Sequence, residues 1–129
     1  MDLPAVASKL DGALGLRLEG AEGGVATLRL DPGEIGVVTE EEREYLHGGT
    51  LATCIDTAAW YAAASASAGD WLVAGLQVEA LRLARPEPHS ITARCVRAGR
   101  TRAVVDVEIA SDADPERVVT VGRVSLLRG

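Results

Sequence analysis

Aromatic side chains are scarce in this chain of 129 residues. They make up 3% of it, and phenylalanine is absent. Because 47% of the residues are nevertheless hydrophobic, the chain can form one core of ordinary domain size. That core has to be built from Leu, Val and closely packed Ala. We therefore expect a single domain over residues 1–129.

Lysine is also nearly missing, and acids outnumber bases. Twelve of the 13 basic residues are Arg, and the formal net charge is −6. Residues 1–56 carry eleven acids against four bases, whereas residues 57–129 carry eight against nine. An acidic domain without a basic cluster repels a nucleic-acid backbone, which argues against nucleic-acid binding. Individual Arg side chains still suit the phosphates of a small ligand.

Cysteine and histidine each occur only twice, in no spacing typical of a metal site or a disulfide framework. Cys54 and Cys95 belong to no C-x-x-C pair, and the N-terminus lacks the pattern of a signal peptide. We therefore expect a cytoplasmic protein without a bound metal. One Ala-rich run approaches membrane-spanning length, but Asp56 and several Ser and Thr residues within it argue against a membrane span.

The hydrophobic pattern predicts strands on both sides of one long helix. Alternation and turn residues predict strands over 14–19, 25–30, 71–84, 89–98, 102–111 and 117–127. A helix is predicted over 50–68, where eight of nineteen residues are Ala, with Gly69 as its C-terminal stop. Residues 2–11 predict a short leading helix, and 34–46 a loop or short helix. This order indicates an α+β fold, in which a curved sheet of consecutive antiparallel strands covers the helix.

The start of the long helix carries the strongest functional signal. His47, Gly48 and Gly49 stand where the helix begins, and Asp56 is the only charged side chain between Tyr45 and Gly69. A carboxylate in such apolar surroundings is costly to bury unless it is paired or has a function. Helix N-terminal N–H groups suit a developing oxyanion, and glycine permits close approach to the backbone. A second interpretation makes Asp56 the N-cap of a shorter helix, with residues 48–55 a strand or loop.

The His-Gly-Gly-x₆-Asp spacing, together with the order of helix and strands, resembles the hotdog-fold acyl-CoA thioesterases of the PaaI type. The resemblance implies a curved antiparallel sheet wrapped around one long central helix, and hydrolysis of an acyl-CoA. It implies that Asp56 acts as general base or nucleophile and that a Gly48 or Gly49 N–H binds the thioester oxygen. His47 would orient this segment or contact the thioester. No cofactor is implied, since CoA is part of the substrate.

Helix geometry predicts how such a site is assembled. Gly48 and Asp56 are eight residues apart, which is about 12 Å along one helix. Both groups have to lie within about 3 Å of one carbonyl centre. One chain cannot satisfy this, so a thioesterase of this sequence requires at least a homodimer with two shared sites. Val-rich strands over 89–127 leave a homotetramer open.

Further residues are candidates for binding the substrate. Trp60 lies one helical turn from Asp56 and lines an acyl pocket or packs in the core; His89 is expected in a turn. The substrate-binding candidates are Tyr45, Leu46, Trp60, Leu76, Gln77, Arg85, Arg97 and Arg100, with the arginines facing CoA phosphates; Trp71 is a further guess for the pocket lining.

The chain departs from the PaaI pattern at two positions near the site. Glu41 stands where the family often has Asn, and Leu76 or Gln77 stands where it often has Ser or Thr. These departures favour a rival function, a hotdog dimer that binds acyl-CoA or another apolar ligand without hydrolysing it. A hotdog hydratase ranks third because no His follows Asp56 in the helix, and no G-x-S-x-G elbow of a serine hydrolase occurs.

Overall fold

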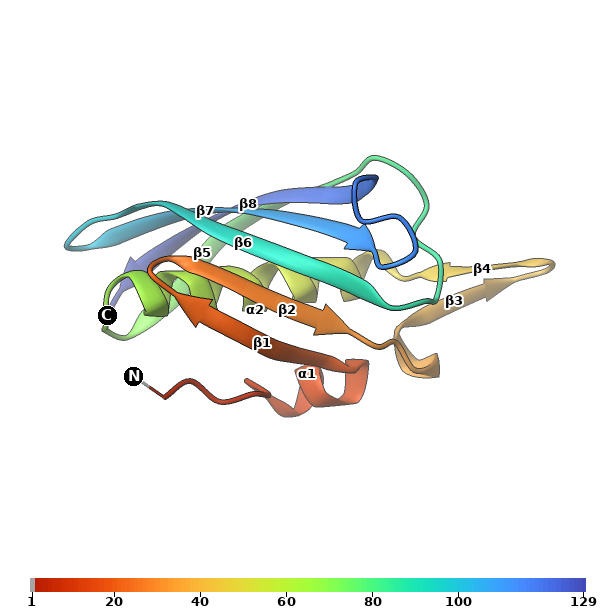
Figure 1. Cartoon of the computed structure of the whole chain (residues 1–129), viewed down its shortest axis with the longest axis horizontal. Helices are drawn as coiled ribbons and strands as arrows, with labels where there is room; N and C mark the ends of the chain where they lie inside the picture. The colour runs from red at the N-terminus through yellow and green to blue at the C-terminus, as the bar shows by residue number, and fades with distance from the viewer. Residues whose placement is uncertain (1) are drawn as a thin grey trace.

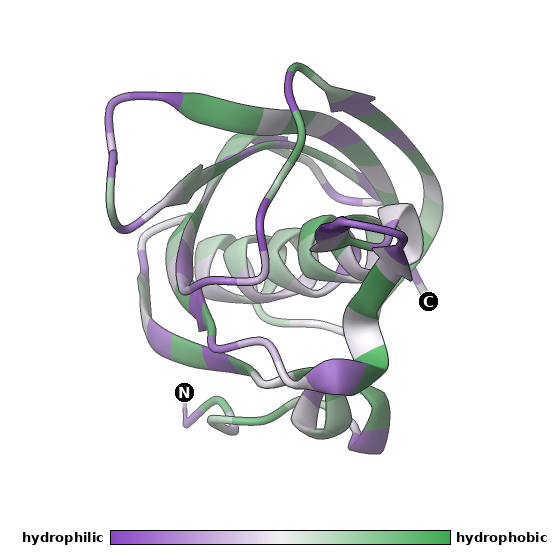
Figure 2. Cartoon of the chain, turned by 90° about the vertical axis from the view of Figure 1, so that its right-hand side faces the viewer, coloured by the Kyte–Doolittle hydropathy of each residue, from purple (hydrophilic) through white to green (hydrophobic). Residues whose placement is uncertain are grey.

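A computed structural model describes residues 2–129 and shows a curved sheet that encloses one long helix (Figures 1 and 2). The helices are α1 (Lys9–Leu14) and α2 (Gly48–Ala66), and a 3₁₀ turn, η1, spans Glu34–Gly36. The strands are β1 (Leu16–Glu22), β2 (Val25–Leu30), β3 (Val37–Glu40), β4 (Arg43–Leu46), β5 (Trp71–Ala80), β6 (His89–Ala98), β7 (Arg102–Ser111) and β8 (Val118–Arg128). The predicted α+β class, with a curved antiparallel sheet around one long helix, is confirmed.

The main sheet has six antiparallel strands in the order β1-β2-β6-β7-β8-β5. The long helix α2 lies inside its curve, as the end-on view in Figure 2 shows. Strand β5 pairs with β8, and β6 pairs with β2. Strand β5 is therefore separated in the sheet from β6, the next strand of the chain, and lies beside the last strand, β8.

Several predicted boundaries were wrong. The leading helix covers Lys9–Leu14 instead of 2–11 because Ser8 caps it and accepts the Asp11 N–H. Residues 34–46 begin with the short 3₁₀ helix η1, as the prediction of a loop or short helix allowed, but the rest forms the hairpin β3–β4. The long helix ends at Ala66 with Ser67 as its C-cap, ahead of Gly69, and β5 ends at Ala80 instead of 84.

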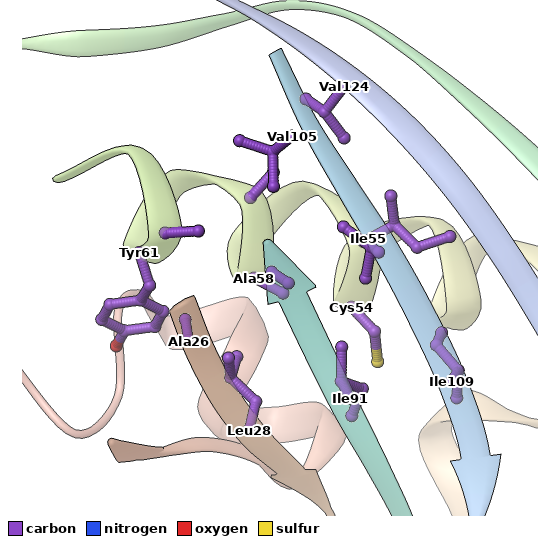
Figure 3. Close-up of a cluster of buried hydrophobic side chains, with 14 of the residues drawn as sticks. Ala26, Leu28, Cys54, Ile55, Ala58, Tyr61, Ile91, Val105, Ile109 and Val124 are labelled. Atoms are coloured by element: carbon purple, nitrogen blue, oxygen red, sulfur yellow. The ribbon is translucent and has the colours of Figure 1, made fainter. Parts of the chain in front are cut away.

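The core forms where α2 packs against the inner face of the sheet (Figure 3). Cys54, Ile55, Ala58 and Tyr61 of α2 are at most 1% exposed. They meet inward-facing side chains from four strands, labelled in Figure 3 as Ala26, Leu28, Ile91, Val105, Ile109 and Val124. The many Ala side chains of the helix are small, so its backbone can lie close to the sheet. With few aromatic side chains to fill a wider gap, the core requires this close packing.

Gly122 of β8 shows how close this approach is. A Cβ at Gly122 would lie 2.8 Å from Ile55 Cδ1 and 2.8 Å from the Gln77 carbonyl oxygen. Both distances are too short for real contacts, so only glycine fits between α2 and the neighbouring strand β5. Glycine at position 122 thereby lets the helix segment that carries Ile55 and Asp56 lie this close to the sheet.

His89 does not lie in a turn as expected; it is the first residue of β6 and has no exposed surface. Its Nδ1 lies 2.6 Å from the Glu87 carbonyl oxygen. Since a carbonyl can only accept, Nδ1 carries a proton in this contact. His89 is therefore buried where β6 begins, and its ring is bound to the backbone just before the strand.

Across residues 2–129, no helix is long and apolar enough to cross a membrane. Within the same residues, no three His, Cys, Asp or Glu side chains gather in a group that could hold a metal ion.

Candidate functional site

The helix α2 begins in a defined way at His47. His47 is the N-cap, and its Nδ1 accepts the Gly49 N–H at 2.8 Å. Its carbonyl oxygen accepts the N–H of Thr50 at 2.9 Å. Because the Gly49 N–H is used by the cap, it is not available to a substrate. His47 thus caps the helix start, and its role toward a substrate stays a prediction.

Gly48 is the first residue of the helix and is exposed. Its N–H makes no hydrogen bond within residues 2–129. A Cβ at Gly48 would meet no atom within 4 Å, so the surface above this N–H is open. Of the two glycines, Gly48 is therefore the one whose backbone can donate to an incoming carbonyl oxygen.

The start of α2 is held against η1 by two hydrogen bonds to one carbonyl. The His47 N–H and the Thr50 Oγ1 both donate to the Gly36 carbonyl oxygen at 2.9 Å. A Cβ at Gly36 would lie 2.7 Å from Thr50 Oγ1, so glycine is needed there. These contacts fix the direction in which the Gly48 N–H points.

Asp56 lies two turns further along α2 and is half-buried. The interpretation of Asp56 as an N-cap is wrong, because residues 48–55 are helical. Its carboxylate has no ion-pair or hydrogen-bond partner within residues 2–129. Partial burial raises the pKa of Asp56, and the negative charge of Asp11 raises this pKa further. The result is a carboxylate that accepts a proton more readily than an exposed one.

Asp56 faces a pocket of about 430 Å³ between α1, α2 and β5. The apolar part of the lining comes from these three elements and the segment before α1: Ala7, Leu10, Ala52, Trp60 and Leu76. The volume is within the range of small-ligand sites. The structure thus brings together Asp56, Trp60 and Leu76, three of the residues singled out in the sequence, around one cavity.

The polar part of the lining contains a second carboxylate, Asp11, which the sequence did not indicate. Asp11 is 3% exposed and accepts hydrogen bonds from Ser8 Oγ at 2.6 Å and from Thr57 Oγ1 at 2.7 Å. Thr57 is the neighbour of Asp56 in α2. The only available signal for Asp11 was an acid at the end of a predicted helix, because its partner Thr57 lies 46 residues away in sequence.

Cysteine chemistry is not supported at this site. Burial raises the pKa of the Cys54 thiol to about 12, so the thiol stays protonated. Cys95 lies on β6, and burial raises its pKa as well. Cys54 belongs to the core, on the side of α2 that faces the sheet (Figure 3).

Comparison with known proteins places the chain in a family. The model of the thioesterase superfamily matches residues 44–123, which include the helix start, all of α2 and most of the sheet. The chain belongs to the thioesterase superfamily. No curated protein sequence matches it at a significant level.

Solved structures of thioesterase-like proteins share the fold over most of their length. The E. coli PaaI protein from the phenylacetic acid degradation operon is 22% identical, with a TM-score of 0.82 over 95% of this chain and 85% of that one. A hypothetical thioesterase from Streptococcus pneumoniae, solved with coenzyme A, is 20% identical, with a TM-score of 0.79 over 92% and 89%. A Streptococcus mutans protein bound to acetyl-CoA is 19% identical, with a TM-score of 0.77 over 88% of each chain.

These likenesses show the hotdog fold, and together with the family model they confirm the predicted resemblance to PaaI-type thioesterases. The superfamily match begins at Glu44 and therefore excludes α1. Asp11 and the part of the pocket around it therefore lie outside the residues that match the superfamily model.

The remaining candidates lie away from the pocket of their own chain. Tyr45 and Leu46 are on β4, where the Tyr45 hydroxyl donates to Glu40 at 2.9 Å and Leu46 is buried. Gln77 lies in a separate surface hollow near Asp106 and Arg123. Trp71 packs under the Arg128 guanidinium, 4.3 Å from the ring centre. Their roles in binding substrate stay predictions.

The three arginines proposed for CoA phosphates do not form one group in a single chain. Arg85 precedes β6, whereas Arg97 and Arg100 lie at its other end and in the following turn. The strand between these ends spans nine residue steps, or about 30 Å. One phosphate group therefore cannot contact Arg85 and Arg100 of the same chain together.

Proposed function

We propose that this protein hydrolyses an acyl-CoA thioester to a free acid and CoA. The observation that carries the proposal is Asp56, a half-buried carboxylate without a partner in the described chain, facing a pocket beside the helix. Membership of the thioesterase superfamily supports the reaction class, and CoA or acetyl-CoA in two similar structures supports the ligand.

The reaction uses two groups of this chain. Asp56 takes a proton from a water molecule as the water oxygen bonds to the thioester carbon. The Gly48 N–H stabilises the negative charge on the carbonyl oxygen, together with the positive end of the α2 dipole. Collapse of this intermediate breaks the C–S bond, and the proton held by Asp56 passes to the CoA thiolate. No further cofactor is required.

Asp56 can alternatively attack the thioester carbon itself, which expels the CoA thiolate and forms a mixed anhydride that water then hydrolyses. A single turnover in ¹⁸O-labelled water tests for this route. Label in the Asp56 side chain shows an anhydride that water opens at the Asp56 carboxyl carbon, whereas label only in the product acid is the result expected of a general base or of water attack at the acyl carbon.

The proposed site includes a second copy of the chain. Gly48 and Asp56 are about 12 Å apart along α2, so one copy supplies the N–H and the other the carboxylate. Strand β5 is at the edge of the sheet, with no second strand partner in residues 2–129. It exposes Leu72 (67%), Leu76 (38%) and Val78 (36%). An apolar edge strand of ten residues is an aggregation hazard unless it is covered, so we propose that two copies pair along β5.

One observation favours the rival function, a dimer that binds acyl-CoA without hydrolysis. The hydroxyls in the pocket already donate elsewhere: Thr53 to the Gly49 carbonyl, Thr57 and Ser8 to Asp11. Leu76 adds no hydroxyl, and Glu41 lies exposed at the tip of the β3–β4 hairpin. Among the groups that one chain contributes, Asp56 is then the only one left to orient a water molecule, which predicts a slow enzyme or none.

The experiment that decides between them is CoA release from aromatic, short and medium acyl-CoAs, for wild type and Asp56→Asn. Hydrolysis that falls by about 10² or more in the variant supports the enzyme and its base. Asp114→Asn, an exposed position in the β7–β8 turn, is the matched control. If wild type releases no CoA above background but binds acyl-CoA as tightly as Asp56→Asn does, the binding function replaces it.

A further inference from the structure

The pocket beside Asp56 has an uneven charge. Its lining includes two carboxylates, Asp11 and Asp56, and no Lys or Arg within the described residues. The rest of the surface is apolar or carries hydroxyl groups. Among the side chains that one chain contributes, a ligand group that enters this pocket therefore meets negative charge without a compensating Lys or Arg.

Asp11 has the geometry of a fixed carboxylate. It is 3% exposed, and its two oxygens accept hydroxyl hydrogen bonds at 2.6 and 2.7 Å from Ser8 and Thr57. These lengths are typical of hydroxyls that donate to a charged carboxylate. The donors come from two different segments, one before α1 and one in α2. Asp11 is thus held in place by a hydrogen bond to each of its oxygens.

The position of the pocket indicates which part of the substrate enters it. In the proposed function the reacting carbonyl lies next to Asp56, so the acyl chain and the CoA arm leave that point in different directions. The phosphates of CoA are anions, and the pocket holds two carboxylates. Leu10, Ala52, Trp60 and Leu76 instead offer surface for a hydrocarbon chain or ring.

We propose that this pocket is the acyl site and that Asp11 makes it selective for neutral acyl groups against those that end in a carboxylate. This inference rests on the proposed thioesterase function. A terminal carboxylate would be placed near Asp11 in a partly enclosed space, where repulsion between like charges is poorly screened. Asp11 is a specificity residue here and takes no part in the proton transfer.

The test compares hexanoyl-CoA with glutaryl-CoA, whose chain has similar length but ends in a carboxylate. We expect wild type to favour hexanoyl-CoA by about 30-fold or more in kcat/KM. Asp11→Asn keeps the size of the side chain and can still accept from Thr57, so it should fold. In this variant the preference should fall by about fivefold or more, through a gain for glutaryl-CoA.

Two further variants make the result specific. Ala7→Lys places a cation at an exposed position in the lining, and it should also reduce the preference. It keeps the test decisive if Asp11→Asn does not fold. Asp114→Asn changes the net charge by the same amount away from the pocket and should leave the preference unchanged.

Binding of S-hexyl-CoA and S-(4-carboxybutyl)-CoA, thioethers that cannot be hydrolysed, separates this inference from the proposed function. If no thioester is hydrolysed but wild type prefers the hexyl thioether and Asp11→Asn does not, the thioesterase fails and the acyl site stands. If hexanoyl-CoA and glutaryl-CoA are hydrolysed equally well, the enzyme stands and the charge selection is overturned. A preference that persists in folded Asp11→Asn also overturns it, as does one that persists in Ala7→Lys where Asp11→Asn does not fold.

Discussion

The two sides of helix α2 differ in what they contribute. The side that faces strands β2, β6, β7 and β8 is fully buried: Cys54, Ile55 and Ala58 have no exposed surface. The side that faces α1 and β5 is half-open, and it holds Ala52, Asp56 and Trp60 around the pocket. Ile55 and Asp56 are neighbours in sequence, but Ile55 packs in the core whereas Asp56 faces the pocket. The comparison teaches that stability and chemistry can be changed separately on one helix.

The largest effect on stability is expected on the fully buried side. Ile55→Ala removes a fully buried side chain that packs against Gly122, and should lower the free energy of unfolding by about 2–5 kcal/mol. Chemical denaturation measures this. Thr53→Ala, on the half-open side, should change the unfolding free energy by less than about 1 kcal/mol. Equal losses for both variants would contradict the difference between the two sides.

The start of helix α2 offers a sharper test, because a substitution there should lower activity without lowering stability. Gly48→Pro removes the proposed donor, while proline is favoured at the first position of a helix. His47 has φ −60° and ψ 140°, which a following proline allows. We expect kcat to fall by about 10²–10³ with little change in thermal stability.

Gly48→Ala is the matched variant, because it keeps the N–H and its Cβ meets no atom within 4 Å. Its kcat should exceed that of Gly48→Pro by at least about tenfold. Similar kcat values for the two variants would mean that the N–H of Gly48 is not the donor.

A smaller effect is expected at the cap. His47→Ala removes the acceptor of the Gly49 N–H and should lower the free energy of unfolding by about 1 kcal/mol. His47→Asn restores a capping side chain and should recover most of this loss. If the two variants were equally stable in thermal denaturation, the cap would contribute nothing to stability.

The smallest effect is a pH dependence of stability at Asp56. Its pKa is raised in the folded chain, so folding favours the protonated form, and stability falls as pH rises from the unfolded value of 3.8 through the folded one. Asp56→Asn should therefore have a slightly higher Tm than wild type near pH 7. The difference should vanish below pH 3.8. A lower Tm for the variant at pH 7 would contradict the sign.

The elements that carry a strong local pattern could be predicted from the sequence. The long helix follows from its Ala content, and β6 and β7 follow from alternation between turn residues. The hairpin β3–β4 could not, because its Glu-rich run has no strand pattern and its turn needs Glu41 at a φ of 48°. The pairing of β5 with β8 was also out of reach, since it joins distant parts of the chain.

In the site, too, the residues that could be predicted belong to a local pattern, and those that could not depend on contacts between distant segments. Gly48 and Asp56 stand out because their spacing lies within one helix, and Trp60 follows from helical periodicity. Asp11 was missed because its contact with Thr57 depends on where α1 docks. The separation of Arg85 from Arg97 and Arg100 likewise depends on the length and direction of β6, which chemistry at single positions does not reveal.

In the proposed site, one copy supplies Gly48 and the other supplies Asp56. Mixing two inactive variants tests this arrangement most directly. Gly48→Pro and Asp56→Asn are each expected to be inactive as homodimers. Dissociated and reassembled together, they form mixed dimers in which one of two sites is intact. CoA release should then recover to about a quarter of the wild-type rate, since half of the dimers are mixed. If the mixture stays as inactive as its components while mixed dimers are present, the shared site is contradicted.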